Sequence, residues 1–184
     1  FTLKDSGIHE LEDLRGKTLV FSDPSSSSGF VYPLALLLGR GIDPVHDAGR
    51  VILSGSHTNS LTALAEGRAE VAAAPFESYI KSVRQGAIDP RRVRIIAKSD
   101  PIPNPPIAIN GELPQNIIDR LRQALHTVHT FPGMEPGMIR GHAGNVVDRY
   151  NAEVPPELFD KARRNMGLVN NAYRAEILRK AADR

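Results

Sequence analysis

The sequence predicts an α/β protein in which helices cover both faces of a doubly wound, mostly parallel sheet. Between residues 18 and 97, short apolar segments alternate with helical ones, the connections are short, and glycine or proline marks most of the ends. A regular strand–helix alternation of this kind is typical of parallel strands joined by helical crossovers.

Each predicted strand and helix is indicated by a run of apolar residues or by a residue that interrupts one. The predicted strands are residues 18–21, 51–53, 70–74 and 93–97. Pro75 ends the third strand, because proline cannot donate a hydrogen bond to a neighbouring strand. The predicted helices are a short turn at 8–14, a longer helix from the serines to about Gly39, and the segments 59–66 and 77–84.

The pattern changes after the fourth strand. Four prolines between residues 100 and 106 predict an extended connector. Residues 1–3 and 107–109 are predicted to form short strands that cross side by side. Further helices are predicted at 114–128, where the apolar residues form a stripe, and at 156–166 and 172–182.

The composition is that of a globular protein and excludes several classes. Of 184 residues, 41% are apolar and 24% are charged, and the net charge is +2, so no nucleic-acid surface is indicated. Cysteine is absent, which excludes disulfides and thiolate zinc sites, and no apolar run is long enough for a bilayer. Because the chain starts in strand-like sequence without a methionine or signal peptide, we expect a mature or truncated piece of a longer protein.

Four consecutive serines, residues 25–28, stand where the strand 18–21 leads into a leucine-rich helix. The first N–H groups of a helix have no intrahelical partner, and the helix dipole places partial positive charge there. Hydroxyls and free N–H groups together form an anion site that needs no cationic side chain. The alternative is a hydrophilic loop with one capping serine, since caps are common. The position at a strand-to-helix junction favours the anion site.

Other polar residues follow the later strands, at the edge where open α/β sheets bind ligands. His57 comes after the second strand, Glu77 after the third, and the fourth leads toward Asn104. We expect these residues to converge with the serines. Each also has a simpler interpretation: a capping or solvated histidine, a glutamate that complements a helix dipole, and a turn residue.

Catalytic and metal sites are not indicated. The serine segment does not fit the G-x-S-x-G nucleophile motif. There is no glycine-rich phosphate-binding loop either, because the G-K-T at residues 16–18 lacks the upstream glycine and precedes its strand instead of following it. His126 and His129 are within reach of a shared metal, but no carboxylate partner is evident, so a solvated helix face is favoured. We therefore expect no catalytic residue, metal or cofactor.

Several spaced motifs resemble a known family. The run LEDLRGKTLVFSDPSSSSG, residues 11–29, resembles the periplasmic solute-binding proteins of phosphonate and phosphite ABC transporters, which carry a similar lead-in and a D-P-x-S-x-S-G loop before a helix. Gly55-Ser56-His57 resembles their next motif, and Glu77 falls where the family places a ligand-contacting acid. The segment 102–105, I-P-N-P, resembles one that carries an aspartate in aminoalkylphosphonate binders.

The resemblance implies a role for each candidate residue. A phosphonate, phosphite or related tetrahedral oxyanion would be held by helix N-terminal amides and by Ser26, Ser27 and Ser28. His57 would add a hydrogen-bond donor, and Glu77 would accept a proton or pair with an amine. Because Asn104 stands in place of the aspartate, we expect a weaker hold on a ligand ammonium group. The protein should prefer a protonated oxyanion, or a ligand with an uncharged tail, over aminoalkylphosphonates.

The resemblance also implies an architecture and partners. The fold would be that of a type II periplasmic binding protein, whose two lobes close over the ligand like a hinge. Residues 1–9 would be a crossing strand, 10–103 the α/β ligand-binding lobe, and 104–184 the return strand and helices of a second lobe whose N-terminal half is missing. We expect a monomer, an ABC permease as partner, and a place in the periplasm or on the outer face of the cytoplasmic membrane.

Two alternatives stay open at this point. The same fold serves as the sensor domain of transcription regulators and histidine kinases, and an upstream helix-turn-helix or membrane segment would favour that function. A small-molecule enzyme with this fold is the weaker alternative, which turnover assays would test.

Overall fold

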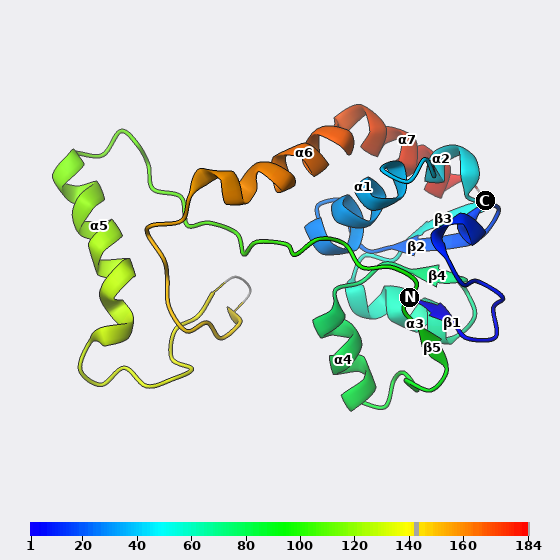
Figure 1. Cartoon of the computed structure of the whole chain (residues 1–184), viewed down its shortest axis with the longest axis horizontal. Helices are drawn as coiled ribbons and strands as arrows, with labels where there is room; N and C mark the ends of the chain where they lie inside the picture. The colour runs from blue at the N-terminus through cyan, green and yellow to red at the C-terminus, as the bar shows by residue number, and fades with distance from the viewer. Residues whose placement is uncertain (142–143, 184) are drawn as a thin grey trace. The chain divides into compact units, whose positions relative to one another are not determined.

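The computed structural model describes residues 1–141 and 144–183 and divides into two compact units (Figure 1). Residues 1–102 form the first unit together with the C-terminal segment that starts at Ala162. Residues 103–161 form the second unit. The candidate site depends mainly on the first unit, because that unit holds the sheet and the serines.

The first unit is built on a five-stranded sheet of order β3-β2-β4-β1-β5. The strands are β1 (Thr2–Leu3), β2 (Thr18–Phe21), β3 (Arg50–Leu53), β4 (Val71–Ala72) and β5 (Val93–Arg94). β2 pairs in parallel with β3 and β4, whereas β1 lies antiparallel between β4 and β5. All strands except β1 therefore run in one direction, which confirms the mostly parallel sheet.

Helices cover both faces of this sheet (Figure 1). One face carries α1 (Tyr32–Leu38), α2 (Pro44–Asp47) and α7 (Asn171–Ala182), and the other carries α3 (His57–Ala65) and α4 (Phe76–Arg84). Successive side chains of a strand point to opposite faces. In β2, Leu19 and Phe21 accordingly pack in the α1 core, whereas Val20 packs with α3. The doubly wound arrangement is thus confirmed.

The predicted pair of crossing strands is wrong. Residues 107–109 form no strand, and Ile107 is 55% exposed. Pro105 and Pro106 directly precede this segment and supply no N–H group for pairing. β1 instead fills the gap between β4 and β5, where Thr2 is fully buried and its hydroxyl donates to the Glu70 carbonyl at 2.8 Å.

The other predicted elements differ mainly at their ends. The short turn is a 3-10 helix, η1 (Leu11–Leu14), and α2 was not predicted. α3 begins two residues earlier than expected, because the Ser56 side chain caps it by accepting from the Asn59 N–H. The serines enter α1 through a π-helical turn, η2 (Ser27–Val31), so the predicted single helix has two parts.

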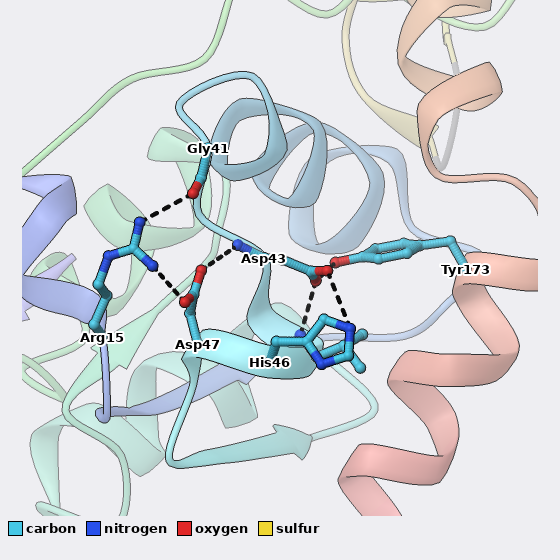
Figure 2. Close-up of polar contacts among 7 residues, drawn as sticks. Arg15, Gly41, Asp43, His46, Asp47 and Tyr173 are labelled. Carbon is cyan, nitrogen blue, oxygen red and sulfur yellow. Dashed lines mark hydrogen bonds and ion pairs between the residues drawn. The ribbon is translucent and has the colours of Figure 1, made fainter.

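A polar network attaches α7 to the sheet unit (Figure 2). The Tyr173 hydroxyl donates to the Asp43 carboxylate at 2.6 Å, and Asp43 also caps α2 by accepting from the Val45 N–H at 3.0 Å. Asp47 accepts from the Asp43 N–H and pairs with Arg15, which ties α2 to the segment after η1. Ile177 of α7 is fully buried in the core.

The second unit contains α5 (Gln115–Thr127), the 3-10 turn η3 (Val128–Thr130) and the 3-10 turn η5 (Pro156–Phe159). Helix α6 (Asp160–Leu168) begins at the end of this unit and continues into the first unit from Ala162. α5 confirms the helix predicted at 114–128, yet none of its residues is buried. The predicted division of the chain into one lobe and parts of a second lobe stays a prediction. Within the described residues, no helix combines the length and apolarity that crossing a membrane requires.

Candidate ligand-binding site

The loop between β2 and α1 is closed by its own polar groups. The Ser22 N–H donates to the Gly29 carbonyl at 3.0 Å, and the Ser26 N–H donates to the Asp23 carbonyl at 2.8 Å. The Asp23 carboxylate accepts from both the N–H and the hydroxyl of Ser25, and these bonds lower the pKa of Asp23. Hydrogen bonds among its own residues therefore hold the loop in this structure.

The predicted serines have different partners in this loop. The Ser26 hydroxyl is the N-cap of η2 and accepts from the Gly29 N–H at 3.0 Å. Ser27 and Ser28 lie at the first positions of η2, and their N–H groups donate to none of the described residues. Two backbone donors and two hydroxyls are therefore available at one helix N-terminus, as the sequence predicts.

His57 reaches the same place from the next strand of the sheet. It is the first residue of α3, and its Nε2 lies 3.4 Å from the Ser28 hydroxyl oxygen. Its ring is partly buried, and this burial lowers the pKa of His57 below the ordinary value of 6.5. The imidazole is therefore neutral near pH 7, with one nitrogen that donates and one that accepts.

Gly29 lets the two segments approach closely. A Cβ atom at this position would lie 2.0 Å from the Ser22 Oγ and 2.7 Å from the His57 Nδ1. Both distances are shorter than any van der Waals contact, so no larger residue fits without displacement. The small residue explains how the serine loop and the start of α3 come together.

One residue near the loop was not predicted from the sequence. Arg174 of α7 donates to the Pro24 carbonyl at 3.1 Å and, through Nε, to the Val169 carbonyl at 3.0 Å. It brings a guanidinium group to the backbone just before the serines. No local pattern reveals this contact, because it depends on how α7 packs against the sheet 150 residues away along the chain.

Comparison with known proteins decides the family. Residues 1–138 match the sequence model of the phosphonate periplasmic substrate-binding proteins of ABC transporters. The chain belongs to this family. The predicted resemblance is thereby confirmed, and the family is described as a transport component.

Two named proteins are similar to this chain in sequence. The chain is 30% identical over 155 residues to the phosphate-import protein PhnD of Mycolicibacterium smegmatis, a match that covers 78% of this chain and 47% of the relative. It is 31% identical over 122 residues to the phosphonates-binding periplasmic protein of Escherichia coli, covering 64% of this chain and 36% of the relative. The matches thus span less than half the length of these relatives.

Solved structures agree with the observed fold. A binding protein component of an ABC phosphonate transporter from Pseudomonas aeruginosa matches 68% of this chain and 43% of its own, with 28% identity and a TM-score of 0.52. A Xanthomonas citri protein solved with ATP matches 97% of this chain and 64% of its own, with a TM-score of 0.66. Its identity is only 22%, so this likeness concerns the fold alone.

Glu77 and Asn104 were also predicted to contact the ligand. Glu77 lies in the first turn of α4, is exposed, and lines a shallow groove along that helix with Phe76, Ile80 and Lys81. Asn104 is exposed and belongs to the second unit. The ligand contacts of both residues stay predictions. Among the described residues there is no group of histidines and carboxylates that could hold a metal ion.

Proposed function

We propose that this chain forms the ligand-binding lobe of an ABC-importer solute-binding protein and captures a tetrahedral oxyanion at the start of η2. The ligand class is a phosphonate, phosphite or related phosphate ester. One observation carries the proposal: Ser28 and His57, from two different strand ends, lie 3.4 Å apart beside two N–H groups that donate to no described residue. Such a set of donors suits an oxyanion.

Neutral donors fit an import protein that must also release its ligand. The N–H groups of Ser27 and Ser28, their hydroxyls and one His57 nitrogen contribute dipoles and no formal charge. A hydrogen bond to a charged group is worth roughly 1.5–3 kcal/mol, so a few of them suffice for tight binding. The names of the two relatives, for phosphate and for phosphonates, support a phosphorus oxyanion as the class.

The complete protein would deliver the ligand to an ABC permease, and it would act in the periplasm or at the outer face of the cytoplasmic membrane. The family description supports this place and this partner. A second lobe would close over the bound anion and remove it from water, which strengthens each of these hydrogen bonds.

Glu77 and Asn104 would set the choice among phosphonates. A carboxylate repels a bound dianion, so Glu77 would accept a hydrogen bond from a protonated ligand. Asn104 adds no charge that could help bind an ammonium group. Asn104→Asp should shift preference from methylphosphonate toward 2-aminoethylphosphonate by roughly 1–3 kcal/mol in competition titrations. An unchanged preference would remove Asn104 from the site.

Calorimetry on the full-length protein tests the central proposal. Wild type should bind methylphosphonate or phosphite more tightly than sulfate. The double variant Ser27→Ala, Ser28→Ala should lose on the order of 1.5–3 kcal/mol for each charge-assisted bond. Ser99→Ala is the matched control, because this serine is exposed, lies outside the serine loop, and its hydroxyl donates to the Asp100 carbonyl. Equal affinity in the double variant and the control would refute the role of the serines.

A further inference from the structure

Two buried polar atoms next to the candidate site have no hydrogen-bond partner among the described residues. They are the hydroxyl oxygen of Ser22 and the Nδ1 of His57. Ser22 is 1% exposed, so water does not reach its side chain readily. Buried polar groups are nearly always paired, and an unpaired one costs roughly 1–3 kcal/mol. Two such atoms side by side call for a common explanation.

Both atoms lie against the same face of Gly29. The point where a Cβ of Gly29 would sit is 2.0 Å from the Ser22 oxygen and 2.7 Å from the His57 Nδ1. Since Gly29 has no side chain, nothing from this residue separates the two atoms. Both unpaired atoms therefore border the same small space beside Gly29.

The backbone of Ser22 leaves its side chain little freedom. Its N–H donates to the Gly29 carbonyl at 3.0 Å, and its carbonyl accepts from the Gly55 N–H at 3.3 Å. Ser22 is therefore fixed between the serine loop and the loop that leads to His57. The hydroxyl can move only by rotation about the Cα–Cβ bond, which sweeps it across the space beside Gly29.

We propose that Ser22 is a positioning residue that sets the tautomer of His57. Its hydroxyl donates to Nδ1, so that Nε2 carries the ring proton and presents it toward Ser28 and the oxyanion. This use of the proton rests on the proposed function, whereas the tautomer itself is a property of the free protein.

The tautomer matters because the ring is neutral. A neutral imidazole with its proton on Nδ1 would turn the lone pair of Nε2 toward the anion and repel it. With the proton on Nε2, the same ring donates a hydrogen bond. A serine hydroxyl can donate or accept, so it fits the acceptor form of Nδ1 at no cost in charge.

Nitrogen-15 NMR of the ligand-free protein tests the tautomer directly. The pH is held above the histidine titration, and His57→Gln identifies the resonances. Wild type should show a protonated Nε2 and an unprotonated Nδ1. Ser22→Ala should move population toward the Nδ1–H form, and Ser22→Cys, a close match in size but a weaker donor, should give an intermediate population. The control is Ser60→Ala, a buried serine of α3 whose hydroxyl bonds Ser54.

A wild-type ring protonated on Nδ1, or populations that Ser22→Ala leaves unchanged, would overturn the inference. Methylphosphonate titration of the full-length variants then separates it from the proposed function. Ser22→Ala should weaken binding roughly three- to tenfold, the equivalent of about one neutral hydrogen bond. If wild type shows the expected tautomer but binds no phosphorus oxyanion, the proposed function fails and the tautomer assignment stands.

Discussion

Replacing Gly29 by alanine should disrupt the candidate site more than any other one-carbon change. The added Cβ would lie 2.0 Å from the Ser22 oxygen and 2.7 Å from His57 Nδ1, while a carbon needs well over 3 Å from either atom. The loop is pinned by the bond between the Ser22 N–H and the Gly29 carbonyl, so the Ser22 hydroxyl and the His57 imidazole must give way and their present arrangement is lost.

The magnitude follows from these contacts. Overpacking a buried position costs roughly 1–3 kcal/mol of folding free energy, which urea unfolding would measure as a lower midpoint. Loss of the His57 donor should weaken methylphosphonate binding by roughly 1.5–3 kcal/mol. Gly167→Ala is the control, because its Cβ meets no atom within 4 Å and it lies in helix α6, where alanine is favoured over glycine.

A double-mutant cycle locates the clash. In Ser22→Ala, Gly29→Ala the hydroxyl oxygen is gone, so the two changes should cost less together than the sum of the single costs. If Gly29→Ala unfolds at the wild-type urea concentration and binds methylphosphonate as tightly as wild type, the reasoning about this close approach is refuted.

Two further predictions concern stability. Tyr173→Phe removes the 2.6 Å bond to Asp43 and should lower the free energy of unfolding by roughly 1.5–3 kcal/mol, whereas Tyr79→Phe, whose hydroxyl bonds no described residue, should not. Because folding lowers the pKa of His57, the unfolded chain binds a proton at higher pH than the native one. Stability should therefore fall as pH drops below 6.5 toward the lowered native pKa. His57→Gln should flatten that decline in urea titrations, and an unchanged pH slope would contradict the cause.

The parts of the fold that the sequence predicts are those with a local signature. The apolar run 18–21 forms β2, and Pro75 directly precedes α4, whereas the Ser56 cap went unrecognised and α3 begins two residues earlier than predicted. The approach of His57 to the serines follows from a general rule, because both segments leave the same end of neighbouring parallel strands. Topology thus predicts the main contact of the site.

The parts that escaped prediction depend on distant pairing. β1 has only two residues, and its place between β4 and β5 is decided by partners at Val71 and Val93, which no local pattern identifies. The contact from Arg174 to Pro24 likewise requires the docking of α7. Glu77 and Asn104 were selected by their places after strand ends and by the resemblance, and both side chains are exposed in the structure, so their roles stay predictions.

The internal hydrogen bonds of the serine loop would let the proposed site bind an anion with little rearrangement. Most polar groups from Ser22 to Gly29 have a hydrogen-bond partner, either within the loop or from Gly55, His57 and Arg174. Among the described residues, the groups without a partner include the hydroxyls of Ser22 and Ser27 and the N–H groups of Asp23, Ser27 and Ser28. A loop that is already ordered loses little conformational entropy when a ligand arrives, so more of each hydrogen bond appears as affinity. By the same argument, Arg174→Ala should weaken anion binding through loosening of the loop, even though Arg174 need not touch the ligand.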